Sequence, residues 1–249
     1  MNSAQTRIAE LEHRTEDDQR QLRMAGTKLA ELAQVVAEEL NVDLEIVNLT
    51  WTALPQELLG GNIDLVGHDW GAFVLWHMSL LHPGRMQRQA ILNIPFWPRP
   101  PVDPIALFRH QLGDNFYIVD FQDSDEADRT FASDPDHFFD MLMRKNQVSR
   151  REFDKLPPER RSLSLLQIFG RNESSGDPLL TNSERYYFAQ AFAKTGFAGP
   201  INWYRNWTAN WERLEGVPQV VEVPTLFIGA MDDIVVAPEH IEAMKPFVT

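Results

Sequence analysis

The chain has 249 residues, of which 43% are hydrophobic and 24% are charged, as is typical of globular proteins with a full core. The formal net charge of −13 argues against nucleic-acid binding, because phosphate recognition requires a positive field. No stretch approaches 18 uninterrupted apolar residues, so we expect no membrane span. The absence of cysteine excludes disulfides and thiolate metal sites. With a polar N-terminus unlike a signal peptide, it favours a cytoplasmic location.

Residues 1–50 form an atypical N-terminal segment that is rich in charge and leads into a strand. Apolar residues between Ile8 and Val36 recur at heptad spacing, which predicts an amphipathic helix that packs on its own domain. A coiled-coil partner helix is the alternative. The β-branched stretch 44–49 predicts a strand, and residues 52–61 predict a helix that ends at glycines.

The remainder of the chain alternates between strand and helix patterns. Strands are expected over 63–68 and 91–95, with a buried helix over 72–82 between them. From 97 to 210 the sequence predicts helical pieces separated by proline, glycine and acidic turns, and 224–233 is a buried strand that enters an acidic turn. This order predicts an α/β fold with a mostly parallel sheet. Its core is formed by 51–96 and 211–249, and 97–210 form a helical cap.

The motif GHDWGA at residues 67–72 lies between an expected strand and an expected helix. It matches the nucleophile elbow, a glycine-flanked strained turn, with Asp69 at the nucleophile position. Gly67 and Gly71 are expected to avoid clashes with the neighbouring strand and helix. The backbone N–H of Trp70 is expected to point at the site and to stabilise an oxyanion.

An aspartate at the elbow changes the class of reaction. A carboxylate attacks amides poorly but displaces at an sp³ carbon and leaves an ester intermediate, which suits epoxides and alkyl halides. The alternative interpretation is that Asp69 only caps the helix that follows it.

From about Ile63 to Thr249 the chain resembles epoxide hydrolases of the α/β-hydrolase fold. The resemblance rests on the elbow region, on FYIVDFQ (116–122), on NWYRNW (202–207) and on PTLFIGAMDDIVVAP (224–238). It implies that Tyr117 and Tyr204 face the site from the cap, where a phenol can donate a hydrogen bond or proton to the opening oxygen. It also implies that Asp233, rather than the adjacent Asp232, is the charge-relay acid.

The same resemblance suggests a substrate pocket and its ligand. Trp70, Phe116 and Trp203 are expected to line the pocket, and the substrate is expected to be a small apolar epoxide. No phosphate loop, dinucleotide fingerprint or metal-ligand cluster is evident, so we expect no cofactor and no metal. A homo-oligomer is compatible with the sequence.

The chain departs from the epoxide hydrolase pattern at two places. Residues 1–50 contain no H-G-x-P loop, and no histidine matches the catalytic one expected beyond Asp233. His68 and His240 do not fit that position, so no general base is assigned. The chain therefore looks like an epoxide hydrolase core whose N-terminal strands are replaced and whose C-terminus is cut, and the sheet is expected to be incomplete at both ends.

Two other functions remain open. A haloalkane dehalogenase would also use Asp69, with Trp70 as a halide donor. A non-catalytic ligand-binding remnant or chimera is suggested by residues 33–66, which resemble a lobe segment of amino-acid-type solute-binding proteins. Halide release, diol formation and reversible amino-acid binding separate the three.

Overall fold

The computed structural model describes residues 60, 63–123, 125–145, 148–157, 161, 163–171 and 176–249. The helix expected over 8–36, the strand expected over 44–49 and nearly all of the helix expected over 52–61 lie outside these residues. In the described part of the chain, no helix has both the length and the apolar character that a membrane crossing requires.

A parallel sheet in the order β1-β2-β3 forms the centre of the core. Its strands are β1 (Asp64–His68), β2 (Arg88–Leu92) and β3 (Thr225–Ile228). Gly67 lies opposite Ile91, and Ile91 lies opposite Phe227. Because all three strands run in one direction, their carboxyl ends meet at one edge of the sheet. β1 and β3 are the outer strands among the described residues, as expected for an incomplete sheet.

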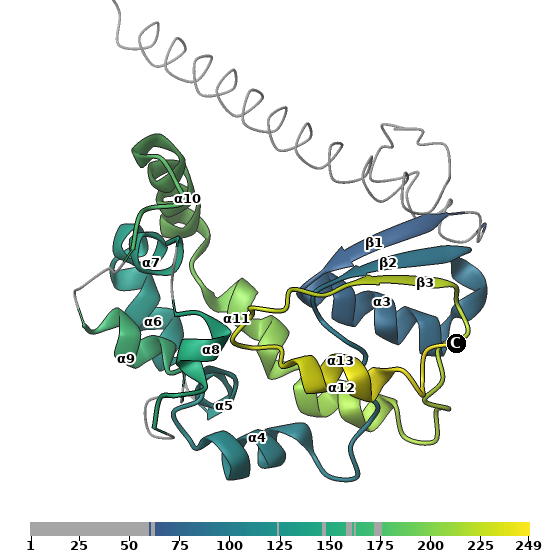
Figure 1. Ribbon diagram of the computed structural model, residues 1–249. Helices are drawn as coiled ribbons and strands as arrows, with labels where there is room; N and C mark the ends of the chain where they lie inside the picture. The colour runs from purple at the N-terminus through teal and green to yellow at the C-terminus, as the bar shows by residue number, and fades with distance from the viewer. Residues whose placement is uncertain are drawn as a thin grey trace, which may run out of the picture.

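Helix α3 (Trp70–Leu81) connects β1 to β2 through the short helix η1 (Pro83–Arg85) and lies along one face of the sheet (Figure 1). Its Ala72, Leu75 and Trp76 are buried against that face. The Trp76 indole Nε1 also donates to the Ile94 carbonyl at 3.0 Å, which fixes the chain after β2. Helix α13 (Pro238–Met244) follows β3 and contributes the buried Met244. The end of the sheet is therefore held to α3 by both packing and hydrogen bonding.

Strand β2 begins and ends three residues earlier than the hydrophobic run at 91–95 suggested. Gln89 is buried in this strand because its amide has partners on both sides: it accepts from Ser79 Oγ and donates to Thr225 Oγ1, each at 2.9 Å. Asn93 ends the strand because its φ of 70° lies outside the β region. The hydrophobic pattern alone misplaced the strand, because a glutamine is expected to be exposed unless its amide has hydrogen-bond partners.

Helices α4 to α12 form a separate helical body beside the sheet (Figure 1). They are α4 (Pro104–Leu112), α5 (Tyr117–Asp123), α6 (Glu126–Ser133), α7 (Pro135–Leu142), α8 (Arg150–Phe153), α9 (Leu165–Phe169), α10 (Asn182–Thr195), α11 (Ala198–Arg205) and α12 (Trp207–Arg213). Aromatic side chains dominate its interior, with Phe121, Phe131 and Phe197 buried together. The sequence 97–210 therefore contains the helical pieces that its punctuation predicted.

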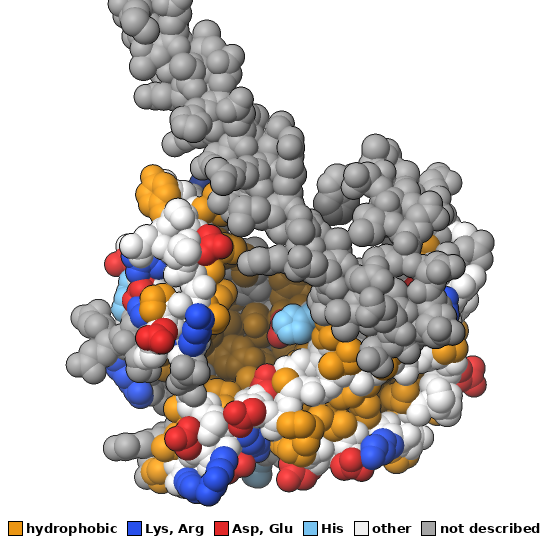
Figure 2. Space-filling view, turned by 45° about the horizontal axis from the view of Figure 1, so that its top comes forward, with side chains coloured by type: hydrophobic (Ala, Val, Ile, Leu, Met, Phe, Trp, Pro, Cys, Tyr) orange, Lys and Arg blue, Asp and Glu red, His pale blue; other side chains and the backbone are white. Residues whose placement is uncertain are grey.

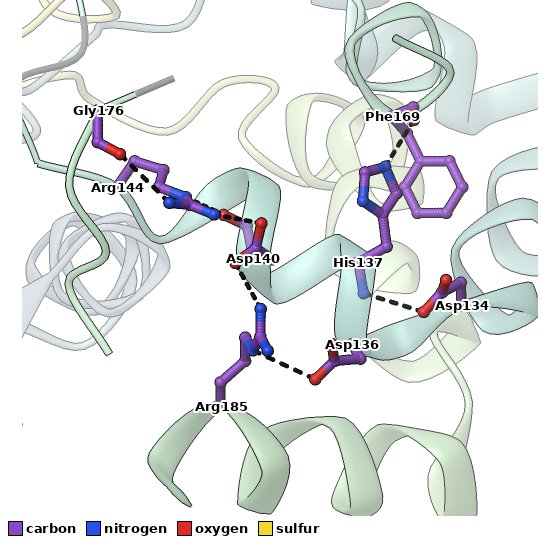
Figure 3. A network of polar contacts seen from close by, with 8 residues as sticks. All are labelled: Asp134, Asp136, His137, Asp140, Arg144, Phe169, Gly176 and Arg185. Carbon is purple, nitrogen blue, oxygen red and sulfur yellow. Dashed lines mark hydrogen bonds and ion pairs between the residues drawn. The ribbon is translucent and has the colours of Figure 1, made fainter. Parts of the chain in front are cut away.

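An ion-pair network stabilises the far end of this body (Figure 3). Asp140 on α7 pairs with Arg144 one turn further on and with Arg185 on α10. Arg185 also pairs with Asp136 at 3.3 Å, and Arg144 donates to the Gly176 carbonyl at 3.2 Å. Because the Asp140–Arg144 pair is largely shielded from water, losing one partner would leave a poorly solvated charge. The network thus holds α10 against α7.

Replacement by alanine is predicted to change the free energy of unfolding in opposite directions at Gly67 and Gly71. A Cβ on Gly67 would lie 2.6 Å from the Gly71 carbonyl oxygen, whereas a Cβ on Gly71 meets nothing within 4 Å among the described residues. We expect Gly67→Ala to lower the free energy of unfolding by about 1–3 kcal/mol. Gly71→Ala, in the first turn of α3, should raise it by about 0.5 kcal/mol. Urea denaturation measures both, and equal effects would contradict this account of the turn.

Candidate active site

Asp69 occupies a strained turn between β1 and α3. Its backbone has φ 55° and ψ −120°, a combination that L-residues rarely adopt. The strain is compensated locally, because the Asp69 carbonyl accepts the N–H groups of Ala72 and Phe73 at 3.0 and 3.2 Å. The Asp69 carboxylate Oδ2 accepts the Trp70 N–H at 2.7 Å. The turn therefore presents an exposed carboxylate at the carboxyl end of β1, with one oxygen on a backbone donor.

The Trp70 side chain joins the elbow to the helical body. Its ring lies 5.1 Å from that of Tyr204, 5.8 Å from that of Trp203 and 5.7 Å from that of Trp207, centroid to centroid. Trp203 is half-exposed beside it, with 51% of its surface accessible. Rings from α11 and α12 thus lie against the residue that follows Asp69.

Tyr117 on α5 and Tyr204 on α11 lie together, with their ring centroids 5.4 Å apart. Two long side chains hold these helices in register. Gln122 Nε2 donates to the Tyr204 carbonyl at 2.9 Å, and Arg205 Nε donates to the Phe121 carbonyl at 2.8 Å. Although the tyrosines are 87 residues apart in sequence, the structure brings them to one place next to Trp70.

Both phenols are held in the protonated form. Burial raises the pKa of Tyr117 far above the ordinary value of 10.0, and the neighbouring Tyr204, Asp69 and Asp233 raise it further. Burial also raises the pKa of Tyr204; a side-chain hydrogen bond with Trp70 opposes this rise, and the Asp69 charge adds to it. The Asp69 charge thus acts on both phenols, and the Asp233 charge acts on Tyr117. The arrangement offers two protonated O–H donors within the field of these carboxylates.

The two adjacent aspartates after β3 point to different partners. Asp233 Oδ1 accepts the N–H groups of Val235 and Val236 at 2.6 and 3.0 Å, and Asp233 Oδ2 accepts Asn93 Nδ2 at 2.7 Å. Asp232 instead accepts the backbone N–H of Arg150, at the start of α8, at 2.9 Å. Asp233 therefore faces the sheet, while Asp232 binds the helical body.

Asn93 is a polar residue of this site that the sequence analysis did not identify. It follows β2, between the strands that lead to Asp69 and Asp233. In a sequence, a single asparagine after a short strand is interpreted as an ordinary turn residue. Its position within the hydrophobic stretch ILNIP was the one available signal.

The described histidines that form hydrogen bonds do so with backbone groups. His77 Nδ1 contacts the Phe73 carbonyl oxygen, and His240 Nδ1 accepts the Ala237 N–H at 3.3 Å. Burial lowers the pKa of His240, Arg150 lowers it further, and Glu239 opposes both. Among the described residues, no histidine hydrogen-bonds to Asp69 or Asp233, so the structure assigns no base there.

A cavity of about 950 Å³ extends from Trp70 between α3 and the helical body. Its wall includes all three of the expected pocket residues, namely Trp70, Phe116 and Trp203. Most of the other lining side chains are aromatic or aliphatic, among them Phe73, Trp97, Phe108, Trp207 and Trp211. Figure 2 shows that the surface is hollowed beside the helical body and that hydrophobic side chains line the hollow. The surroundings of Trp70 suit an apolar ligand.

Comparison with known proteins agrees with this architecture. A family model described as the alpha/beta hydrolase fold matches residues 44–247, which confirms the fold predicted from the sequence. Epoxide hydrolase A of Mycobacterium tuberculosis is 33% identical over 180 residues, which are 68% of this chain and 53% of that protein. Bifunctional epoxide hydrolase 2 of Sus scrofa is 29% identical over 185 residues, which are 74% of this chain and 32% of that protein.

Solved structures give the same result. Epoxide hydrolase A from Mycobacterium thermoresistibile superposes with a TM-score of 0.65 at 27% identity. An epoxide hydrolase from Vigna radiata superposes with a TM-score of 0.62 at 31% identity. Each match covers 79% of this chain and 62% of the other. The chain thus spans about half of the first mycobacterial relative and a third of the porcine one.

The raised pKa of Tyr117 predicts a loss of stability at alkaline pH. The unfolded chain releases this phenol proton near pH 10, whereas the folded chain retains it, so stability present below pH 10 is lost as the pH rises above it. We expect Tyr117→Phe to remove a slope of about 1 kcal/mol per pH unit from the free energy of unfolding between pH 10 and 11. Urea denaturation at successive pH values tests this, and identical slopes in the two proteins would refute a buried neutral Tyr117.

Proposed function

We propose that this chain, which belongs to the alpha/beta hydrolase fold family and is a relative of epoxide hydrolases, opens epoxides through the Asp69 carboxylate. The observation that carries the proposal is the strained Asp69 turn. It exposes the Asp69 carboxylate at the end of β1, and one oxygen of this carboxylate accepts a hydrogen bond from the Trp70 N–H. Strain of this kind costs about 1–3 kcal/mol and persists mainly where function requires the geometry.

In the proposed reaction, the free oxygen of Asp69 attacks one carbon of the epoxide from the side opposite the ring oxygen. A C–O bond forms to Asp69, and the ring C–O bond breaks with its electron pair moving to the ring oxygen. Tyr117 and Tyr204 donate hydrogen bonds to that oxygen, and one of them supplies its proton. Both phenols carry their protons at neutral pH, so both are available as hydrogen-bond donors.

The surroundings favour an apolar substrate. Trp70, Phe116 and Trp203 line the cavity beside the elbow, where an epoxide with a hydrophobic substituent replaces water at aromatic surfaces. We propose that residues 97–210 act as a cap that carries the two phenols, while 51–96 and 211–249 carry Asp69 and Asp233. The cap then fixes the ring oxygen, and the core supplies the nucleophile.

Completion of the reaction requires hydrolysis of the Asp69 ester. Water attacks the ester carbonyl, whose developing negative charge is stabilised by the Trp70 N–H. One proton of the water passes to the departing oxygen and completes the diol, and the other passes to the phenolate left by alkylation, so that Asp69 is restored as a carboxylate and the tyrosine as a phenol. Asp233 is proposed as the acid that serves this step. Because no described histidine hydrogen-bonds to either aspartate, we expect hydrolysis to be slow relative to alkylation.

The contacts of Trp70 argue against halide release as the main activity. A halide-binding tryptophan requires an accessible indole, whereas the Trp70 ring packs edge-on against Tyr204, with their centroids 5.1 Å apart. The phenol proposed to serve an epoxide therefore lies against the ring that would bind a halide. The family match over 44–247 also overlaps much of the 33–66 segment that resembled a solute-binding lobe.

A reactive aryl epoxide is predicted to leave one covalent adduct per chain. Peptide mass spectrometry should locate it on Asp69, and the Asp69→Asn variant should show none. Sustained diol formation over many turnovers would contradict slow hydrolysis and would point to a base beyond the contacts described. Absence of an adduct from the folded chain would contradict the proposed function.

Removal of either phenol is predicted to slow alkylation. We expect Tyr117→Phe or Tyr204→Phe to reduce the alkylation rate by roughly 10- to 1,000-fold, with a much smaller effect on epoxide affinity. Tyr187→Phe, on the exposed surface of α10, provides a matched control. Stopped-flow or quenched-flow detection of the adduct gives the rate. A double variant that alkylates as fast as the unaltered chain would remove the phenols from the mechanism.

A further inference from the structure

Asn93 forms a three-point junction at the carboxyl end of β2. Its backbone N–H donates to the Ile228 carbonyl at 2.8 Å, its Oδ1 accepts the Ala230 N–H at 3.1 Å, and its Nδ2 donates to Asp233 Oδ2 at 2.7 Å. One residue thus contacts the start of the loop after β3, the end of that strand and the carboxylate within the loop.

The backbone of Asn93 is adapted to this position. Its φ of 70° ends β2 and is a conformation in which asparagine and glycine are the favoured residues. Among these two, asparagine alone supplies a side chain that both accepts and donates. The loop after β3 needs an acceptor for the Ala230 N–H and a donor for the Asp233 carboxylate. The oxygen and nitrogen of the Asn93 amide supply both.

We infer that Asn93 is a positioning residue that fixes the Asp233 carboxylate for hydrolysis of the Asp69 ester, an inference that rests on the function proposed above. Three donors already bind this carboxylate: two backbone N–H groups on Oδ1 and the amide on Oδ2. A carboxylate offers about four lone-pair sites, so one remains on Oδ2 for a base or water. The Asn93 amide sets the direction of that last site, because Oδ2 accepts no other hydrogen bond among the described residues.

This role separates the two halves of the reaction. Alkylation depends on Asp69 and the phenols, and none of them hydrogen-bonds to Asn93 in the described part of the chain. Hydrolysis depends on Asp233, whose orientation Asn93 controls. The Asn93 amide therefore affects the lifetime of the adduct and leaves its formation unchanged.

The test compares Asn93→Gly, Asp233→Asn and the double variant in the full chain with an aryl epoxide as the probe. Glycine keeps the positive φ and removes only the amide. We expect alkylation of Asn93→Gly within twofold of the unaltered chain and an adduct lifetime about tenfold longer. The double variant should match Asp233→Asn alone, because Asn93 acts through Asp233. Asp232→Asn, in the same loop but bound to α8, is the matched control and should keep the original lifetime.

A second measurement does not depend on activity. Native-state hydrogen exchange at the Val235 and Val236 amides should accelerate about tenfold in Asn93→Gly, while the Phe73 amide in α3 keeps its rate. An unchanged adduct lifetime, equal slowing of both half-reactions, or exchange that rises at all three amides would overturn the inference. If the unaltered chain forms no adduct, the proposed function fails, and the exchange data alone decide the role of Asn93.

Discussion

The hydrogen bond from the Trp70 N–H to its neighbouring Asp69 carboxylate is the interaction on which the site depends. It forms because the Asp69 backbone takes up a strained conformation, and that conformation is possible because Gly67 lets α3 approach β1 closely. The buried Ala72, Leu75 and Trp76 hold the helix in that position. Packing on the sheet thereby offsets the backbone strain of about 1–3 kcal/mol and leaves the carboxylate exposed.

The electrostatics of the site explain why phenols suit it. In the proposed reaction, negative charge passes from Asp69 to the ring oxygen as the ester forms, and the charge of Asp233 also reaches Tyr117. Donors are therefore needed next to the oxygen, and they must remain neutral. Burial together with the two carboxylates raises the phenol pKa values, so the charges that oppose an anion also keep its donors protonated.

Sequence was sufficient for the parts of the site that local pattern encodes. GHDWGA identified the turn of Asp69, and the family resemblance indicated Tyr117 and Tyr204, which the structure places beside Trp70. Gly71 was expected to relieve a clash, but of these two glycines Gly67 alone has a close backbone neighbour among the described residues. Asn93 and the start of β2 were missed because their reasons are long-range. Asn93 is 140 residues from Asp233, and Gln89 is 136 residues from Thr225.

The strand order explains why a neutral residue stands between the two aspartates. Neighbouring strands lie about 4.8 Å apart, so the ends of β1 and β3 are separated by roughly 10 Å, with β2 between them. Asp69 and Asp233 therefore follow strands that are not adjacent, and a carboxylate after β2 would add a third negative charge between them. An amide can instead bind Asp233 without adding charge near Asp69. The strand order thus separates the carboxylate proposed to attack from the acid proposed to serve hydrolysis.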